Sequence, residues 1–205
     1  MSMHRGTVYV LDDEPEMVTA LARLLRGKGF AVRGYTSGHA FLEAFRWESD
    51  ACLVLDVAMP ELDGLELQQR LTHKGTPIPI VFLTGHGDIP MSVRAIKAGA
   101  TEFLTKPVEA DTLVQAVLDA LQVAAERRKV AEETADLKAR LESLTPRQRE
   151  VMEHIVAGQL NKQIAFDLGT GEQNIKIHRA QIMKKMGVDS LADLVRAAEH
   201  LGIHK

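Results

Sequence analysis

Short apolar stretches and longer amphipathic ones alternate along the first half of the chain. The short ones are predicted to be strands, because a brief apolar run without polar alternation suits a strand that is buried on both faces. These strands are Thr7–Leu11, Ala31–Tyr35, Ala51–Asp56, Ile80–Leu83 and Glu102–Thr105. Apolar residues that recur every three or four positions predict helices between them. The predicted helices are Pro15–Gly27, a helix capped by Ser37 that ends at Trp47, Leu65–Leu71 and Ile89–Ala98.

A regular alternation of strand and helix is typical of a parallel sheet with right-handed crossovers and helices on both faces. A further helix that begins near Ala110 completes five strands and five helices. We therefore predict an α/β, flavodoxin-like fold with a five-stranded parallel sheet for residues 1–122.

Polar side chains stand where four of the predicted strands end. Asp12 and Asp13 follow the first strand, Asp56 ends the third, Thr84 follows the fourth and Lys106 follows the fifth. The carboxyl ends of parallel strands meet at one edge of the sheet, where such folds bind ligands. Carboxylates are the ligands that Mg²⁺ prefers, and a hydroxyl and an ammonium suit phosphoryl oxygens. The sequence therefore predicts a site for Mg²⁺ and a phosphoryl group.

The stretch from Ala110 to Leu144 contains no Gly or Pro and is rich in Ala, Glu, Lys, Arg and Leu. It predicts a long linker helix over residues 123–143 that continues the last helix of the first domain. One stripe of this helix repeats with alternating spacings of three and four, which is the pattern of a weak coiled-coil seam. The stripe consists of Leu113, Ala116, Ala120, Val123, Arg127, Val130, Thr134, Leu137, Leu141 and Leu144.

Residues 144–205 predict a small all-α domain. Thr145 and Pro146 are typical of a helix start, and the four helices expected are Pro146–Ala157, Asn161–Leu168, Gly171–Met186 and Ser190–His200. The second and third have the form of a helix-turn-helix. At about 100° per residue, one face of the third helix points outward and suits base edges in a major groove. This face consists of Gln173, Lys176, Ile177, Ala180 and Lys184, while Lys162, Arg179 and Lys185 are better placed for phosphates.

Composition and charge agree with this division. With 45% hydrophobic and 26% charged residues, the chain has the make-up of an ordinary globular protein. It has no apolar run long enough to span a membrane and no signal segment, and its single cysteine, Cys52, lies in a predicted core strand. We expect a cytoplasmic protein. Residues 1–125 carry 11 Lys and Arg against 16 Asp and Glu, whereas residues 145–205 carry 9 against 7, which favours nucleic acid as the partner of the second domain.

Four motifs of the first domain, in order and at fitting distances, resemble a two-component response-regulator receiver domain. They are LDDE, LVLDVAMPELDG, LTGHGD and the Lys106-Pro107 pair. The string Gly85–Met91 resembles the FixJ branch, and LTPRQREVMEHIVAGQLNKQIA with IKIHRAQIMKKMGVDSLADLVR resembles the LuxR/NarL-type DNA-binding domain. The resemblance implies a phosphorylation-controlled transcription factor with a sensor histidine kinase as phosphoryl donor.

The resemblance also assigns roles to residues. It implies that Asp56 is the phosphoacceptor, that Asp12, Asp13, Asp56 and the Ala58 carbonyl bind Mg²⁺, and that Lys106 offsets phosphoryl charge. Thr84 and Phe103 match the family's switch residues. A homodimer is expected on DNA, with contacts around Ser190–Val195 and near Phe103 and Lys106.

The chain departs from the DNA-binding family at the start of its third helix. Gly171 and Asn174-Ile175 stand where the usual pattern has Ser and Thr-Val. We expect the helix cap to pass to Thr170, and any base contact made by the usual Thr to come from Asn174.

Two other functions compete with this one. A phosphoaspartyl enzyme of the haloacid-dehalogenase kind needs a second Asp two residues after the nucleophile, and Ala58 occupies that position. We therefore expect no enzyme, beyond slow autophosphorylation and autodephosphorylation. Alternatively, the C-terminal helices would serve protein binding or dimerisation, which the outward cations Lys176, Arg179, Lys184 and Lys185 disfavour.

Overall fold

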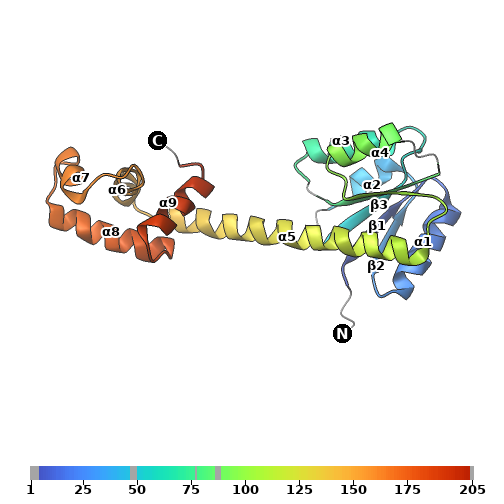
Figure 1. Cartoon of the computed structure of the whole chain (residues 1–205), viewed down its shortest axis with the longest axis horizontal. Helices are drawn as coiled ribbons and strands as arrows, with labels where there is room; N and C mark the ends of the chain where they lie inside the picture. Colours follow the sequence, from blue (N-terminus) through green and yellow to red (C-terminus); the bar gives the residue numbers. More distant parts are fainter. Residues whose placement is uncertain (1–4, 47–49, 77, 86–88, 204–205) are drawn as a thin grey trace. The chain divides into compact units, whose positions relative to one another are not determined.

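A computed structural model describes residues 5–46, 50–76, 78–85 and 89–203 (Figure 1). The chain divides into two compact units, residues 1–128 and 129–205, and each is described by itself. Trp47 and the stretch His86–Asp88, which belongs to the motif shared with the FixJ branch, lie outside the described residues.

The first unit is a five-stranded parallel sheet with the strand order β2-β1-β3-β4-β5, so the predicted flavodoxin-like fold is confirmed. Its strands are β1 (Thr7–Leu11), β2 (Ala31–Tyr35), β3 (Ala51–Leu55), β4 (Ile80–Thr84) and β5 (Glu102–Thr105). Its helices are α1 (Pro15–Gly27), α2 (Gly38–Ala44), α3 (Gly64–His73), α4 (Ile89–Lys97) and the first part of α5 (Ala110–Glu142).

Each face of this sheet has its own apolar core. Side chains of α1 and α5 pack on one face, and side chains of α2, α3 and α4 pack on the other. All five residues of β3 are buried, because the strand is central and covered on both faces. Cys52 lies in this strand, and burial raises the pKa of its thiol to about 12. The thiol is therefore a neutral core group.

Helix α2 is shorter than the sequence predicted. It ends at Ala44, and Phe45 already has an extended backbone. The ring of Phe45 lies 5.3 Å from that of Tyr9 and 5.0 Å from that of Phe41. Leaving the helix at this point allows Phe45 to join the aromatic cluster beside the sheet, which a simple reading of helical periodicity does not reveal.

Helix α5 is one continuous helix of 33 residues, as the sequence predicted, and most of its apolar stripe packs within the chain. Leu113, Ala116 and Ala120 are buried in the core of the first unit. Leu137 and Leu141 pack against the core of the second. Most of the apolar surface of the stripe is therefore buried within the two units, and little of it stays accessible for self-association.

The second unit contains the last part of α5 and the helices α6 (Pro146–Val156), α7 (Asn161–Asp167), α8 (Glu172–Met186) and α9 (Leu191–His200). Thr145 and Gln148 form a reciprocal capping box at the start of α6. One apolar core, to which every helix of the unit contributes, holds the unit together.

The cap of α8 differs from the prediction. Gly171, not Thr170, precedes the helix, and it offers no side-chain hydrogen bond. The Thr170 hydroxyl instead accepts a hydrogen bond from the amide of Asn174, with 3.0 Å between Oγ1 and Nδ2. One N–H of the Asn174 amide is thus engaged in the turn and is not available for a base contact. None of the helices in the described part of the chain is long and apolar enough to cross a membrane.

Candidate phosphoacceptor site and DNA-binding surface

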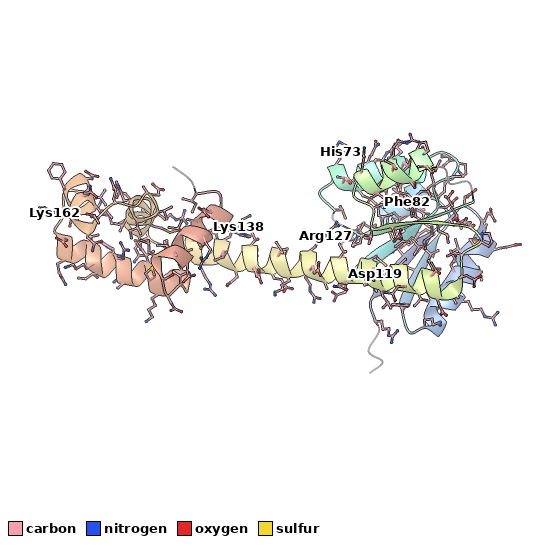
Figure 2. The ribbon with its side chains drawn as sticks, viewed as in Figure 1. His73, Phe82, Asp119, Arg127, Lys138 and Lys162 are labelled. Carbon is pink, nitrogen blue, oxygen red and sulfur yellow. The ribbon has the colours of Figure 1, made fainter. Side chains whose placement is uncertain are left out.

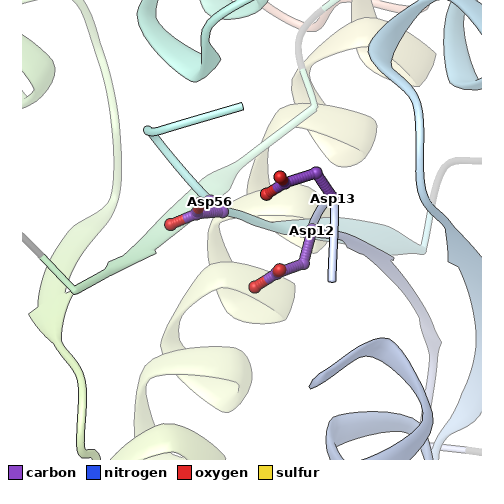
Figure 3. Close-up of side chains that lie close together, drawn as sticks. All are labelled: Asp12, Asp13 and Asp56. Carbon is purple, nitrogen blue, oxygen red and sulfur yellow. The ribbon is translucent and has the colours of Figure 1, made fainter. Parts of the chain in front are cut away.

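Three carboxylates meet where β1 and β3 end. The two strands are neighbours and pair in parallel, with Leu11 opposite Leu55. The N–H of Asp56 continues the pairing by donating to the carbonyl of Leu11 at 2.9 Å. Asp12, Asp13 and Asp56 consequently offer one oxygen each within 4.8 Å of one another, and Figure 3 shows the three carboxyl groups directed to the same side.

Lys106 reaches this cluster from the end of β5. Its backbone N–H donates to the Thr84 carbonyl at 2.8 Å, which fixes it next to the end of β4. Its Nζ lies 2.6 Å from Oδ2 of Asp12 and 3.5 Å from Oδ1 of Asp56. The ammonium therefore offsets part of the carboxylate charge.

Burial and charge act against each other on these groups. Burial raises the pKa of Asp56, whose exposed fraction is only 6%; the Lys106 charge lowers this pKa, and the Asp12 charge raises it further. Burial alone would lower the pKa of Lys106, but its hydrogen bond to Asp12 and the charges of Asp56 and Asp12 raise it overall. Lys106 is thus stabilised as a cation, whereas the negative charge of Asp56 is destabilised by its burial.

The donor set fits a magnesium ion. Oδ1 of Asp56 is buried and accepts no hydrogen bond from any described residue, so the nearby ammonium is its only close compensation among the groups described. A hard divalent cation that binds oxygen would supply what this atom lacks. Ala58, the other expected ligand, is exposed two residues after Asp56, at the same edge of the sheet.

The two predicted switch residues lie on neighbouring strands. Thr84 is the last residue of β4 and is fully buried. Phe103, in β5, is half-buried, and its ring centroid lies 6.0 Å from that of Phe82 (labelled in Figure 2). Phe103 therefore has one side packed against the core and another side accessible to solvent.

The predicted groove face of α8 is exposed. All five of its residues are accessible to solvent: Gln173, Lys176, Ile177, Ala180 and Lys184. Ile177 is 47% exposed although it is a large apolar residue. On the opposite side Ile175, Ile182 and Met186 are buried. The helix thus has an anchored apolar face and a solvent face of mixed cationic, amide and apolar character.

The cations expected to contact phosphates are in different situations. Lys162 is exposed on α7 (Figure 2). Arg179 is half-buried, with its guanidinium 3.5 Å from Oδ1 of Asn161. Lys185 is half-buried as well, and its ammonium donates to the Ser143 carbonyl at 2.7 Å and to Oε1 of Gln148 at 2.9 Å.

Comparison with known proteins identifies both domains. The chain matches the response regulator receiver domain over residues 8–118 and the luxR family of bacterial regulatory proteins over residues 142–198. The chain belongs to the response regulators. It is 43% identical to the response regulator protein TodT of Pseudomonas putida over 201 residues, which cover 98% of this chain and 88% of TodT.

Two further relatives support the assignment to the FixJ branch. The transcriptional regulatory protein FixJ of Bradyrhizobium diazoefficiens is 42% identical over 199 residues, which cover 97% of either chain. A solved structure of the response regulator StyR matches with a TM-score of 0.82 and 48% identity, covering 94% of this chain and 98% of that one.

This response regulator is thus a phosphorylation-controlled regulator of transcription. Its two domains imply, in general terms, a sensor kinase and DNA as partners. The alternatives of a phosphoaspartyl phosphatase and of a purely protein-binding C-terminal domain are not favoured.

One residue of the receiver site could not be found from the sequence pattern. Gly64 is the first residue of α3, and a Cβ at this position would lie 2.3 Å from the Asp56 carbonyl oxygen. Only glycine lets α3 begin this close to the loop that follows β3. In the sequence the Asp63-Gly64 pair indicates a turn, but it does not reveal the backbone that approaches the glycine.

The cost of the Asp56 charge leads to a prediction. Because the pKa of Asp56 is raised in the folded state, its contribution to stability is fully present below the unfolded pKa of about 3.9 and is lost as the pH rises through the folded-state pKa. At pH 7.5 without Mg²⁺, Asp56→Asn should therefore melt at a higher temperature than the wild type. The difference should shrink as the pH is lowered toward 4.

Magnesium should reverse this order. At about 100 times its Kd, Mg²⁺ should stabilise the wild-type protein by about 2.7 kcal/mol and Asp56→Asn by much less. Scanning calorimetry with EDTA or Mg²⁺ measures both effects. The matched control is Asp119→Asn, an acid on α5 (Figure 2) that lies outside the carboxylate cluster and should respond to Mg²⁺ like the wild type. Equal stabilisation of Asp56→Asn would contradict the metal assignment.

Proposed function

We propose that this response regulator accepts a phosphoryl group on Asp56, at a magnesium site formed by Asp12, Asp13, Asp56 and the Ala58 carbonyl. The observation that carries the proposal is the buried Oδ1 of Asp56, which accepts no hydrogen bond from any described residue and lies 3.5 Å from the Lys106 ammonium, while Asp56 itself belongs to the carboxylate cluster. A carboxylate in this position has a free lone pair and a cation beside it, which are the requirements of a nucleophile toward a phosphoryl group.

In the proposed transfer, an Asp56 oxygen attacks the phosphorus of a phosphohistidine on the kinase. The new O–P bond forms as the P–N bond breaks, and the imidazole nitrogen keeps the electron pair of that bond. Lys106 is placed to compensate charge on the phosphoryl oxygens. Bound Mg²⁺ would supply further compensation of the same kind.

The proposed response to phosphorylation uses Thr84 and Phe103. A phosphoryl group on Asp56 places strong acceptor oxygens at the end of β3, beside the strand that carries Thr84. The Thr84 hydroxyl then turns toward the phosphoryl group and donates a hydrogen bond to it. Phe103 changes its rotamer and packs into the space beside Thr84 that this turn leaves. The half-buried state of Phe103 supports such a role, because a fully packed ring would resist the change.

Phosphorylation gives a direct test. Incubation of the full chain with acetyl phosphate and Mg²⁺ should add one phosphoryl group to the wild type and none to Asp56→Asn, as measured by intact-protein mass spectrometry. Asp63→Asn, which changes the exposed cap of α3 to another good capping residue, should label like the wild type. Full labelling of Asp56→Asn would show that another residue is the acceptor.

For DNA, we propose that α8 enters the major groove with the face formed by Gln173, Lys176, Ile177, Ala180 and Lys184. An ammonium can bind guanine, an amide can bind adenine, and an apolar tip such as Ile177 can contact a thymine methyl group. Lys162 and Arg179 contact phosphates in this arrangement. Asn174 contributes only through the part of its amide that Thr170 does not use.

The groove assignment predicts unequal effects of two substitutions. Lys176→Ala should weaken binding to a selected DNA site by about 1–3 kcal/mol, which is the range for a good base contact, and should relax the base preference at one position. Lys162→Ala should weaken binding evenly across sequences and reduce the salt dependence. Fluorescence anisotropy on selected and scrambled duplexes separates the two patterns. Sequence-blind losses of equal size from both variants would contradict the assignment.

We further propose that phosphorylation favours a dimer. Helix α4 exposes three large apolar side chains, Ile89, Val93 and Ile96, and Leu191 at the start of α9 is 41% exposed. Apolar residues left uncovered on one helix are typical of a surface that a partner covers. With beryllofluoride and Mg²⁺, sedimentation should show a heavier species than without them. A monomer under both conditions that still binds DNA at full affinity would exclude this part of the proposal.

A further inference from the structure

The C-terminus of the recognition helix α8 is held by a cation from another helix. The Nη1 of Arg140, near the end of α5, donates to the carbonyl of Met186, the last residue of α8, at 2.9 Å. The last carbonyls of a helix have no partner within the helix and carry a partial negative charge. A guanidinium satisfies both needs at once. Asp136, one turn earlier on α5, holds the other side of the guanidinium at 2.9 Å.

The reverse contact exists as well. The ammonium of Lys185, in the last turn of α8, donates to the carbonyl of Ser143, directly after the end of α5, at 2.7 Å. The same ammonium donates to Oε1 of Gln148 at 2.9 Å. Each of the two helices thus receives a cation from the other at its C-terminal end. We call these two contacts, Arg140 to Met186 and Lys185 to Ser143, the reciprocal cap.

The residue after α8 is adapted to this arrangement. Gly187 has a φ of 66°, and this left-handed backbone conformation by itself favours glycine. In addition, a Cβ at this position would lie 1.8 Å from Nη1 of Arg140. A side chain here would have to displace the guanidinium, so the glycine makes room for the cap as well as for the turn.

A second layer connects the reciprocal cap to α6 and the middle of α8. Gln148 is 5% exposed; its Oε1 also accepts from the N–H of Thr145 at 3.0 Å, and its Nε2 donates to Oε1 of Gln181 at 2.9 Å. The end of α5, the start of α6 and the C-terminal half of α8 therefore share one polar network. Gln148, at the centre of this network, is buried and both atoms of its amide have partners, so it favours one arrangement of the three segments.

We propose that Arg140 and Lys185 are positioning residues for DNA recognition: they set the orientation of α8 on the last turns of α5 and do not touch DNA. This inference rests on the proposed groove face of α8, and it reassigns Lys185, which its place on the helical projection had put among the phosphate contacts. Its ammonium donates to two protein oxygens, so two of its three N–H groups are directed at the end of α5 and at Gln148 and not at solvent.

The test uses the full-length protein with beryllofluoride and Mg²⁺. The probes are a duplex that the wild type selects from a random pool and a scrambled duplex of equal length. The variants are Arg140→Gln and Lys185→Met, and their effects are compared with those of Lys162→Met as the phosphate contact and Lys176→Ala as the base contact. Lys138→Met, an exposed cation on α5 (Figure 2), is the matched control and should bind within about twofold of the wild type.

A misoriented α8 should lose base contacts and keep phosphate contacts. We expect Arg140→Gln and Lys185→Met each to weaken binding to the selected duplex about tenfold, as for one lost base contact, with an unchanged salt slope on the scrambled duplex. Lys162→Met should lower that slope by about 0.9. The double variant should be little weaker than either single one, because both changes release the same helix.

Each result decides between the alternatives. If Lys185→Met lowers the salt slope as Lys162→Met does, Lys185 contacts phosphate and the proposal fails. Wild-type binding of the selected duplex by Arg140→Gln, or a hundredfold loss in the double variant, also overturns it. If instead Lys176→Ala has no effect on either duplex, the groove face itself is wrong.

A conservative variant separates orientation from folding. Arg140→Lys keeps a cation at the helix end and should recover at least half of the loss on a logarithmic scale; no recovery counts against the proposal. Circular dichroism of each variant tests its folding. If Arg140→Gln does not fold, the two single variants Arg140→Lys and Lys185→Met are compared instead.

Discussion

The parallel pairing of β1 with β3 is the constraint on which the receiver site depends. Because Leu11 stands opposite Leu55, the next residues along the two strands, Asp12 and Asp56, come out side by side at the same edge. A shift of the pairing by one residue would turn every side chain of one strand to the other face of the sheet. The two buried cores, one on each face, make such a shift very costly. The hydrophobic effect thus fixes the separation of the two carboxylates.

The same constraint makes the site electrostatically expensive. Three carboxylates within 4.8 Å of one another repel, and the raised pKa of Asp56 shows that one ammonium does not offset the burial of its charge. The sheet can hold this arrangement because stability comes from apolar residues elsewhere in the cores. A site that costs free energy when empty gains most from a cation or a change of charge. Sensitivity to ligand and stability of the fold are therefore supplied by different residues.

Much of this could be read from the sequence, because the signals were local. Short apolar runs predicted the strands, and Thr145-Pro146 predicted the start of α6. The sequence was less informative where a distant contact decides: Phe45, just after α2, packs on the ring of Tyr9 in β1, and the Asp56 backbone requires Gly64. The two hydrogen bonds of the Lys185 ammonium likewise depend on residues outside its helix, Ser143 and Gln148. A helical projection shows in which direction a side chain leaves its helix, but not what it meets there.

Helix α5 shows how a periodic pattern can have two physical causes. Spacings of three and four arise in a coiled coil, but they arise equally in any helix that packs one side on a core. At its start α5 packs on the sheet through Leu113, and at its end it packs on the C-terminal helices through Leu137 and Leu141. Between these two ends, Val130 is the one large apolar stripe residue, among the described residues of α5, that is left exposed, at 54%. A single valine among polar neighbours buries too little surface to hold two helices together. A dimer of this protein therefore has to draw its stability from surfaces other than the α5 stripe, and the exposed apolar side chains of α4 are better suited to supply it.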